Sequence, residues 1–593
     1  MSSSAKLIGQ AASPGIVLGR CWPVDRRRVR TPKRRLGEAD VEPELARFRA
    51  ALETSDRQLA EVRTKVAAAE GSEHTAIIDM HRLMLKDEML VQETQRLIRQ
   101  EHVNAEWAVK RAIRKIKGSF SEVADEYFKE RRADLDYVGE RIIKNLMGEV
   151  VDAQEAPPEG AVVVAHDLSP ADTALLLHDG KVAAFVTETG ARTSHTAIVA
   201  RALEIPAVVG VGRISTLAAR GDFVIVDGQR GLVILNPTPG ERADGEAARE
   251  KWLAGERELL GMSALPATTQ DGVSIRLVGN IEFAEEVKSL VSHGGEGVGL
   301  YRTEFLYMGR ADLPDEEEHY RTYRQLLEAL APRPVTVRTF DLGADKLPAG
   351  APKVHDQNPA LGLRAVRYCL RHPDLFRTQL RGLLRASVHG NLRIMFPMVS
   401  GVAELRATKR ALLESREELR REGVETRLPP IGIMVELPSA ALIADRLARE
   451  CEFLSIGTND LIQYTMAIDR QNKEVAYLYR PMHLAVVRML KLICDAGRAA
   501  RIPVSMCGEM AGEPFYALVL IGLGLSELSM NGPSIPLVKR IIRAASAADG
   551  RRLVERLLEL TTAEEMEREL RTEMTRKFPG LLEKESAPGP VAG

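Results

Sequence analysis

Eight short apolar runs, each followed by a helical stretch, fill the second half of the chain and constrain its fold more than any other feature. The runs are IRLVGNIE, GVGLYRTEF, VTVRTFDLG, LRIMFPMVS, IGIMVELPS, FLSIGTNDL, IPVSMCGEM and LSELSMN. Eight strand–helix repeats over about 300 residues predict a (β/α)8 barrel. We place this barrel at residues 263–575.

Polar side chains gather at the C-terminal ends of these runs. They are Asn280, Glu282, Arg302, Glu304, Arg338, Asp341, Glu436, Asn459, Asp460, Cys507, Glu509 and Asn531. In barrels of this kind the C-terminal face of the strands carries the active site. Polar residues also mark where strands meet solvent, but that alternative predicts turn-forming residues rather than repeated Arg and Glu. The pattern therefore predicts a functional site built from several strand ends.

The first half of the chain has a different pattern. No proline follows Pro43 between residues 37 and 147, and apolar residues recur there at helical spacing, which predicts a subdomain of three or four long helices. Short apolar strands and turns follow, and the extended stretch Pro14–Val24 can join the same sheet. We therefore predict a multidomain α/β protein. Its predicted parts are an α/β domain at 1–36 and 148–240, a helical insertion at 37–147, a linker helix at 241–262, the barrel, and a disordered tail at 576–593.

Composition argues against several classes of protein. The formal net charge of −1 gives no global basic field for nucleic acid or an anionic membrane, and the basic run Arg26–Arg35 is typical of an exposed loop. No apolar run approaches the roughly 18 residues of a transmembrane helix. The five cysteines are widely spaced and form no CxxC pair, which disfavours a disulfide framework or a zinc site. We expect a cytoplasmic protein without nucleic-acid binding or membrane insertion.

His195 lies in TGARTSHTAIVARALEIPAVVG, where a permissive Gly190 precedes Arg192. Thr193 or Ser194 can cap the helix that follows. A histidine at a helix N-terminus faces backbone N–H groups and the positive end of the dipole, which keeps its imidazole neutral and nucleophilic near pH 7. The same groups and Arg192 can stabilise a phosphate on the ring. Local sequence alone, however, favours a capping or core histidine.

Arginines and carboxylates form a second group on the predicted barrel face. The arginines, on different loops, are Arg302, Arg338 and Arg470. Three converging guanidinium groups suit a small polyanion. Glu436 and Asp460 are either ion-pair partners of these arginines or ligands of Mg²⁺, which takes one or two carboxylates plus substrate oxygens. Cys507 is either a buried core residue or a proton donor at a strand tip.

Seven motifs in order resemble those of enzyme I of the bacterial phosphotransferase system, the phosphoenolpyruvate–protein phosphotransferase family. They are GARTSHTAIVARALEIPAVVG, GLYRTEFLYM, VRTFDLGADK, LRIMFPM, GIMVELPSA, FLSIGTNDLIQYTMAIDR and MCGEMAG. The resemblance implies an enzyme that takes a phosphoryl group from phosphoenolpyruvate, releases pyruvate and passes the group to the carrier protein HPr in sugar transport. It also implies a swivelling phosphohistidine domain and a homodimer formed through the barrel.

The resemblance implies roles for individual residues. His195 matches the histidine phosphorylated on Nε2, and Cys507 matches the residue that protonates enolpyruvate. Phosphoenolpyruvate-binding positions match Arg302, Arg338, Asn459, Asp460 and Arg470. Mg²⁺ ligands match Glu436 and Asp460. We expect supporting roles for Ser169, Arg192, Asp341, Lys346 and Arg364.

The helical insertion matches the part of the family that docks HPr, with His81 and Arg131 as expected docking residues. Because two distant sites then share His195, we expect a hinge near the linker helix. Ala191 and Ala344 stand where the family usually has glycine. Replacing glycine by alanine destabilises the backbone appreciably only where φ is positive and is a small change where φ is negative. We expect activity to survive these two replacements.

Other readings stay open at this point. Pyruvate phosphate dikinase and phosphoenolpyruvate synthase share the histidine domain and the barrel, but they need a nucleotide-grasp domain for which this chain has no room. A regulatory protein that binds a carrier without turnover is disfavoured by the intact Arg, Glu, Asp, His and Cys positions. A nitrogen-regulatory carrier could replace HPr; we expect the sugar system, because no sensory domain precedes Ala12.

Overall fold

The computed structural model describes most of the chain. The described residues are 4–24, 31–70, 76–119, 126–148, 157–168, 176, 181–190, 195–202, 204–307, 312–343, 358–470, 472 and 474–579. The chain divides into two compact units, Met1–Gly255 and Glu256–Gly593. Within the described ranges, no helix combines the length and apolar content that a membrane span requires.

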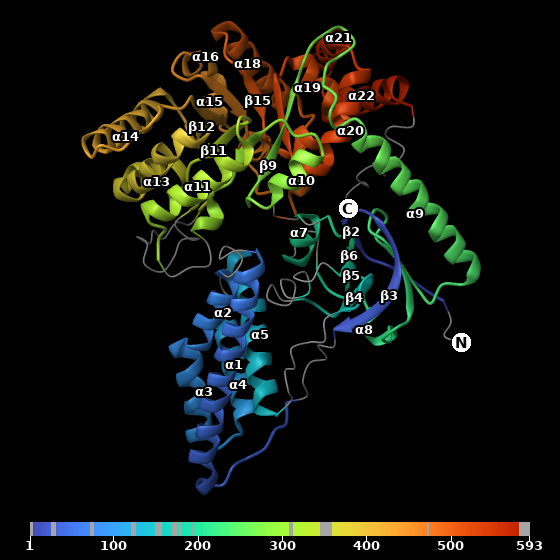
Figure 1. Ribbon diagram of the computed structural model, residues 1–593, viewed down its shortest axis with the longest axis vertical. Helices are drawn as coiled ribbons and strands as arrows, with labels where there is room; N and C mark the ends of the chain where they lie inside the picture. Colours follow the sequence, from blue (N-terminus) through green and yellow to red (C-terminus); the bar gives the residue numbers. More distant parts are fainter. Residues whose placement is uncertain are drawn as a thin grey trace. The chain divides into compact units, whose positions relative to one another are not determined.

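The helical subdomain contains five α-helices in its described residues: the ten-residue α2 and four longer helices of 14 to 30 residues, in agreement with the predicted three or four long helices. They are α1 (Val41–Glu70), α2 (Ala76–Leu85), α3 (Glu88–Glu101), α4 (Ala105–Ser119) and α5 (Glu126–Leu146), preceded by the short 3-10 helix η1 (Glu38–Asp40) (Figure 1). Asp87 is the physical reason for the extra break. Its carboxylate accepts hydrogen bonds from the backbone N–H groups of Met89 at 2.8 Å and Leu90 at 3.4 Å, and so begins α3 directly after α2.

The apolar spacing of α4 explains how the bundle forms its core. The buried apolar residues of α4 recur every three or four positions on one face: Ala105, Ala108, Val109, Ala112, Ile113 and Ile116. They belong to one hydrophobic cluster with Leu97 and Ile98 of α3 and Ile142 of α5. The core of the bundle therefore lies along the shared faces of these helices.

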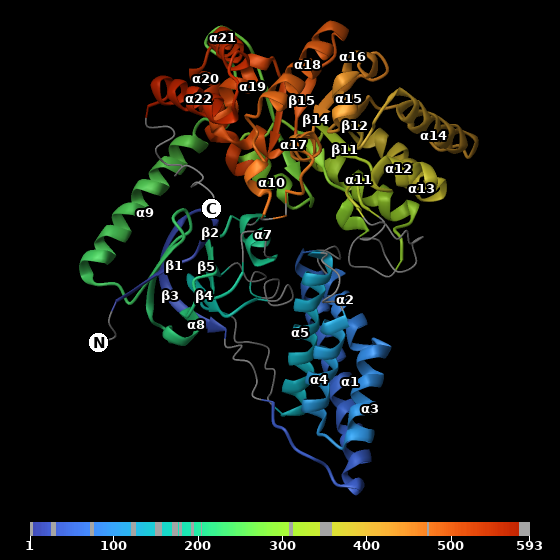
Figure 2. The same cartoon turned by 180° about the vertical axis from the view of Figure 1, so that it is seen from behind.

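The α/β domain is built on an eight-stranded sheet in the order β1-β8-β7-β3-β4-β5-β6-β2. Figure 2 labels strands β1 to β5 of this sheet. The strands are β1 (Ala5–Ile8), β2 (Gln10–Ser13), β3 (Ile16–Val24), β4 (Ala161–Ala165), β5 (Val182–Thr187), β6 (Ala207–Val209), β7 (Phe223–Asp227) and β8 (Leu232–Leu235). β3 pairs with β4 in parallel and with β7 antiparallel. The prediction that the extended N-terminal stretch joins this sheet is therefore confirmed.

Two strands at the N-terminus were not expected from the sequence. β1 pairs with β8 at one edge of the sheet and β2 with β6 at the other, although only Gly9 separates them. A Cβ at Gly9 would lie 2.6 Å from the carbonyl oxygen of Val209, so the close approach of the backbone at this position requires glycine. One continuous segment therefore joins the two edges of the sheet. In the described residues of this domain, the chain forms the helices α7 (His195–Ala202) and α8 (Ile214–Leu217).

A single helix, α9 (Pro239–Leu260), spans the predicted linker, and the boundary between the two units falls inside it. Thr238 and Glu241 fix its start. The Thr238 backbone N–H donates to Glu241 Oε2 at 2.9 Å, and the Glu241 backbone N–H lies 3.3 Å from Thr238 Oγ1. The bond from the Thr238 N–H to the carboxylate, with hydrogen bonds from Ser4 and Lys6, lowers the pKa of Glu241 to about 2. The linker thus begins as a firmly capped helix.

All eight apolar runs form strands of a closed parallel barrel, which confirms the predicted fold class. The strands are β9 (Arg276–Ile281), β10 (Val298–Tyr301), β11 (Pro334–Arg338), β12 (Asn391–Phe396), β13 (Ile431–Val435), β14 (Phe453–Ile456), β15 (Val504–Met506) and β16 (Glu527–Met530). Each pairs in parallel with the next, and β16 pairs with β9 to close the barrel. Most strand residues are buried on both faces, as is typical of parallel strands covered by helices.

Helices cover the outside of the barrel (Figure 1). They are α10 (Glu286–Ser292), α11 (Glu316–Leu330), α12 (Ala365–Arg371), α13 (Pro373–Ala386), α14 (Val402–Arg421), α15 (Pro438–Leu442), α16 (Ala444–Leu447), α17 (Thr458–Met466), α18 (Leu484–Ala500), α19 (Ala517–Leu523), α20 (Ile535–Ala544), α21 (Ala547–Leu558) and α22 (Ala563–Lys577). One large hydrophobic cluster runs between these helices and the strands. The core of the second unit is therefore the layer that surrounds the barrel wall.

Helices α19 and α21 approach each other closely at Gly522 and Gly550. A Cβ at Gly522 would lie 2.2 Å from the carbonyl oxygen of Gly550, and a Cβ at Gly550 would lie 2.7 Å from that of Leu518. The obstructing atoms are backbone atoms, which cannot rotate away as a side chain can. Both positions therefore require glycine for steric reasons.

We expect Gly522→Ala to lower the free energy of unfolding by about 1–3 kcal/mol, because the added methyl group overpacks this contact. Alanine is the better helix former, so the sign of the effect separates packing from helix propensity. Gly240→Ala is the matched control, since no described atom outside its own helix lies within 4 Å of its Cβ. Urea unfolding of both variants tests the prediction, and equal stabilities would contradict it.

Candidate active site

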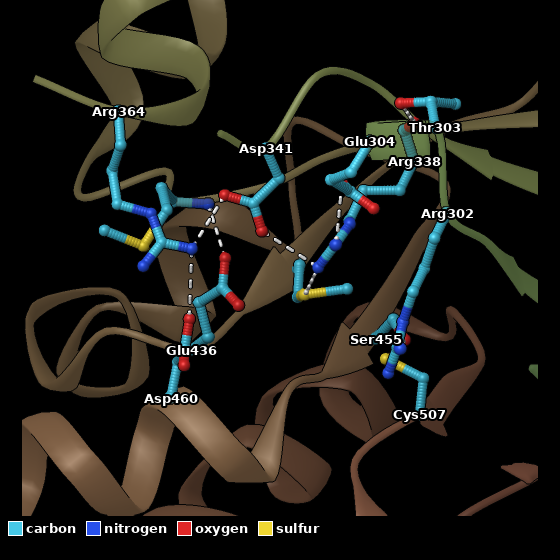
Figure 3. A network of polar contacts seen from close by, with 12 residues as sticks. Arg302, Thr303, Glu304, Arg338, Asp341, Arg364, Glu436, Ser455, Asp460 and Cys507 are labelled. Atoms are coloured by element: carbon cyan, nitrogen blue, oxygen red, sulfur yellow. Dashed lines mark hydrogen bonds and ion pairs between the residues drawn. The ribbon is translucent and has the colours of Figure 1, made fainter. Parts of the chain in front are cut away.

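Several predicted site residues come together at the C-terminal ends of the barrel strands (Figure 3). Arg302 follows β10, Arg338 ends β11, Glu436 follows β13 and Cys507 follows β15, while Asp460 lies in the first turn of α17 after β14. The expected meeting of polar strand ends on one face is therefore present. The contacts between them define what this face can bind.

The guanidinium group of Arg338 lies between two carboxylates. Its Nη2 donates to Glu304 Oε1 at 2.8 Å, and its Nη1 lies 2.9 Å from Asp341 Oδ2. The side chain is only 12% exposed. Burial by itself lowers the pKa of Arg338, but the charges of Glu304 and Asp341 outweigh it and raise the pKa above its ordinary value. Arg338 is thus a charged group largely shielded from water, which suits anion binding.

Asp341 joins Arg338 to a second largely buried arginine, Arg364. Asp341 Oδ1 accepts a hydrogen bond from Arg364 Nη2 at 2.9 Å, and the same Nη2 lies 3.4 Å from Asp460 Oδ2. Burial opposes ionisation of Asp341, but the two guanidinium charges outweigh it and lower the pKa of this carboxyl. We call the four residues Arg338, Asp341, Arg364 and Asp460 the arginine network.

Arg338 and Arg364 each have one N–H donor that is not used within the arginine network. Among the described residues, neither the buried Nε of Arg338 nor that of Arg364 has a hydrogen-bond partner. Buried donors without partners are rare because each costs free energy in the folded state. An anionic ligand can supply the missing acceptors.

The Glu436 carboxylate is buried beside the arginine network. The residue is 2% exposed, and its Oε1 accepts a hydrogen bond from the backbone N–H of Met398 at 2.6 Å. Burial, together with the negative charges of Asp341 and Asp460, raises the pKa of Glu436 well above its ordinary value. A divalent cation relieves repulsion of this kind.

The donor set fits a Mg²⁺ ion shared with a ligand better than one held by the protein alone. Across the described part of the chain, no group of three or more His, Cys, Asp and Glu side chains is arranged to hold a metal. Mg²⁺ commonly binds through one or two carboxylates together with substrate phosphate oxygens. Glu436 and Asp460 supply two such carboxylates next to the arginines.

Three further predicted residues lie around this centre. Arg302 is 41% exposed, and its Nη1 donates to Glu282 Oε1 at 2.6 Å. Asn459 Oδ1 accepts a hydrogen bond from the backbone N–H of Glu509 at 3.1 Å, and its Nδ2 donates to Glu509 Oε1 at 3.3 Å. Arg470 is exposed after α17. None of the described contacts links Asn459 or Arg470 to the arginine network.

The thiol of Cys507 lies inside the barrel. Its Sγ accepts a hydrogen bond from Ser455 Oγ at 3.4 Å and lies 3.7 Å from the carbonyl oxygen of Ile456. It packs in a separate apolar cluster with Leu300, Met395, Met434 and Phe453. Burial raises the pKa of Cys507, so the thiol keeps its proton near neutral pH. A protonated thiol beside an anion-binding network has the chemistry of a general acid.

Several predicted residues fall outside the described part of the chain: Ser169, Ala191, Arg192, Ala344 and Lys346. His195 is the first residue of α7, as the prediction of a histidine at a helix N-terminus requires, although its side chain is outside the described residues. Gly190 has a φ of +111°, which confirms the permissive backbone expected before this motif.

The two residues expected to contact a carrier lie on the helical bundle. His81 of α2 is only 3% exposed, and its ring centroid lies 6.4 Å from that of Tyr137. A side chain this deeply buried presents almost no surface for a carrier to contact. Leu83 and Met89, by contrast, are exposed apolar residues near it in sequence. Arg131 lies on α5, and its side chain is outside the described residues.

Two residues of the site were missed by the sequence-based assignment. Glu304 pairs with Arg338, and burial raises the pKa of its carboxyl. The hydroxyl of Tyr464 accepts from Arg364 Nη1 at 3.4 Å and donates to the carbonyl oxygen of Ala360. Glu304 is one of the polar strand ends, but the pattern does not tell which of them faces an arginine. Tyr464 lies inside a helix, where nothing in the pattern singles it out.

Three family models match successive parts of the chain. Residues 8–131 match "PEP-utilising enzyme, N-terminal", residues 157–231 match "PEP-utilising enzyme, mobile domain", and residues 257–547 match "PEP-utilising enzyme, PEP-binding domain". The mobile-domain match contains His195, and the PEP-binding match contains the arginine network.

Curated proteins named phosphoenolpyruvate-protein phosphotransferase are similar over almost the whole chain. Those of Bacillus sp. (strain S) and Geobacillus stearothermophilus are each 42% identical over 559 residues, covering 94% of this chain and 96% of the relative. That of Listeria monocytogenes serovar 1/2a is 41% identical over 562 residues, covering 95% and 98%. These matches do not favour a dikinase or synthase. The chain therefore belongs to the family of phosphoenolpyruvate-protein phosphotransferases, enzymes that use phosphoenolpyruvate to phosphorylate a protein.

Proposed function

We propose that the enzyme moves the phosphoryl group of phosphoenolpyruvate first to His195 and then to a histidine of the carrier protein HPr, in the first step of sugar phosphotransferase transport. One observation carries the barrel part of this proposal: paired buried arginines, two carboxylates suited to Mg²⁺ and a protonated thiol occupy one face of one barrel. Together they supply anion binding, charge neutralisation and a general acid.

In the proposed first step, Arg302, Arg338 and Arg470 bind the carboxylate and phosphate of phosphoenolpyruvate, with Asn459 and Asp460 completing the site. Asp341 and Glu304 hold the Arg338 guanidinium in place. Glu436 and Asp460 would hold Mg²⁺, and the bound ion would supply positive charge that neutralises phosphate oxygens. These residues orient the phosphorus for in-line attack.

In the proposed chemical step, the neutral Nε2 of His195 forms a bond to phosphorus while the bond between phosphorus and the bridging oxygen breaks. The arginines stabilise the charge that spreads over the phosphoryl oxygens. Cys507 then protonates C3 of the enolpyruvate that leaves, which gives pyruvate. Ser169 and Arg192 support the histidine, and Lys346 supports the phosphate site.

The phosphohistidine must then reach a second site. We propose that the α/β domain moves as a body between the barrel and the carrier, which is consistent with its match to a family model described as a mobile domain. The helical bundle docks the carrier through a surface that includes Arg131. We further propose a cytoplasmic homodimer formed through the barrel; five free, buried cysteines are in keeping with a reducing compartment.

His195→Ala should abolish incorporation of ³²P from labelled phosphoenolpyruvate, because the nucleophile is lost. The matched control is His166→Ala. His166 belongs to the same domain, is 43% exposed and lies 3.1 Å from Glu188 through Nδ1. This control should keep its label. Label that persists in His195→Ala would refute the assignment. Chasing the labelled enzyme with HPr or with a nitrogen-branch carrier then identifies the acceptor.

Arg302→Gln should raise the KM for phosphoenolpyruvate at least about tenfold, because a charge-assisted hydrogen bond to the substrate is lost. Arg276→Gln is the matched control. Arg276 is similarly exposed (47% against 41%) and also pairs with a glutamate, but it begins β9 at the opposite end of the barrel. Steady-state kinetics compare the two variants, and an equal rise in KM for both would exclude a specific role for Arg302.

Asp460→Asn should raise the Mg²⁺ concentration needed for half-maximal labelling at least about tenfold, because a neutral amide is a poorer ligand for a hard cation. Glu509→Gln serves as control, since it removes an exposed charge from the same face and keeps an acceptor for Asn459. Mg²⁺ titrations of labelling at saturating phosphoenolpyruvate measure the difference. Identical Mg²⁺ requirements in both variants would remove Asp460 from the metal site.

A further inference from the structure

Ser455 lies in the barrel wall directly beside the Cys507 thiol. It is the third residue of β14 and is 1% exposed. Phe453 and Ser455 share one face of this strand, and Phe453 belongs to the apolar cluster that surrounds Cys507. Figure 3 shows the serine hydroxyl next to the sulfur. Ser455 therefore places a hydroxyl directly beside this apolar cluster.

The hydroxyl of Ser455 donates its hydrogen bond to sulfur. Ser455 Oγ lies 3.4 Å from Cys507 Sγ. A protonated thiol is a weak acceptor, whereas a thiolate is a full negative charge, and hydrogen bonds to ionised groups are roughly twice as strong as neutral ones. The bond between Ser455 and Cys507 consequently stabilises the thiolate more than the thiol.

Other groups act on the same sulfur from elsewhere in the site. The charges of Arg338 and Arg302 favour the thiolate, and that of Glu436 opposes it. The backbone of Cys507 is held separately, because Asn280 Nδ2 donates to its carbonyl oxygen at 2.9 Å and Ser529 Oγ donates to Asn280 Oδ1 at 2.6 Å. Among the described contacts, Ser455 is thus the side chain that donates a hydrogen bond to the sulfur, while the thiol itself faces the carbonyl oxygen of Ile456 at 3.7 Å.

We infer that Ser455 is the positioning residue for proton delivery to enolpyruvate: it aims the Cys507 thiol and stabilises the thiolate that remains. This inference rests on the proposed role of Cys507. As the S–H bond breaks, its electron pair stays on sulfur, the proton forms the new C3–H bond, and the enolate oxygen becomes the keto oxygen of pyruvate. The thiolate then recovers a proton from water.

The test separates phosphoryl transfer from protonation in a single turnover. Rapid quench measures formation of phosphohistidine and of pyruvate from the same mixture. In Ser455→Ala we expect pyruvate formation to slow about tenfold, while phosphohistidine forms within about twofold of the normal rate, because one charge-assisted hydrogen bond is lost. Since the thiolate is then less stable, the alkaline limb of pyruvate formation should move up by about one pH unit.

Two further serine variants make the test specific. Ser455→Thr keeps the hydroxyl and should restore most of the rate of pyruvate formation. Ser505→Ala is the matched control, because Ser505 is a buried barrel serine on the neighbouring strand whose Oγ donates to the carbonyl oxygen of Leu454 at 3.3 Å. It should leave both rates unchanged. If Ser455→Ala behaves like Ser505→Ala, or slows both steps equally, the inference is overturned.

Cys507→Ala distinguishes this failure from failure of the mechanism on which it rests. If Cys507→Ala slows pyruvate formation and Ser455→Ala does not, only the role of Ser455 is wrong. If pyruvate forms at the normal rate in Cys507→Ala, the proposed acid itself is wrong and the inference falls with it. If both variants slow pyruvate formation selectively, both assignments stand.

Discussion

The pairing of β16 with β9 closes the barrel, and the position of every site residue in the second unit depends on that closure. Because all eight strands are parallel, their C-terminal ends meet on one face, and side chains that are remote in sequence become neighbours. The bond from Asn280 to the carbonyl oxygen of Cys507 joins residues 227 positions apart. It links the end of the first strand to the end of the seventh. Thus the closure that forms the core also assembles the site.

Burial has opposite consequences for different groups on this face. It raises the pKa of Glu304, Glu436 and Cys507, since removal from water disfavours a negative charge. Asp341 escapes this effect because it lies between two guanidinium groups. One desolvated face therefore holds an ionised carboxylate that fixes the arginines and a thiol that keeps its proton. Such divergence between neighbouring titratable groups is how one site supports both charge stabilisation and acid chemistry.

The strands of the barrel could be predicted from the sequence because a buried parallel strand has a signal of its own, a short apolar run with a polar end. The short helix α2 could not be predicted as a separate element, because a single capping residue, Asp87, decides whether α2 and α3 are one helix or two. The pairing of β1 and β2 with opposite edges of the sheet depends on tertiary contacts at Gly9.

The same limit applies within the site. Arginines and carboxylates at strand ends are visible in the sequence, but their partners depend on register and on side-chain direction. Glu304 and Ser455 each occupy an apolar run whose pattern gives no hint of what faces them. For His81, the motif predicts contact with a carrier, whereas packing leaves its side chain only 3% exposed. Local patterns thus identify elements and candidate groups, and packing decides which groups meet.

Under the proposed mechanism, the difference in charge between phosphoenolpyruvate and pyruvate sets the order of the steps. Phosphoenolpyruvate brings a phosphate and a carboxylate to the arginine network, whereas pyruvate retains only the carboxylate. Transfer of the phosphoryl group to His195 thus removes the ligand that the buried guanidinium donors bind most strongly. The general acid, the Cys507 thiol, remains in the barrel beside the enolpyruvate, because its position in the barrel wall is independent of the position of His195. Protonation by Cys507 then converts enolpyruvate to the keto form, pyruvate. Pyruvate therefore binds the arginines more weakly than phosphoenolpyruvate does, and as the keto form it does not easily take the phosphoryl group back.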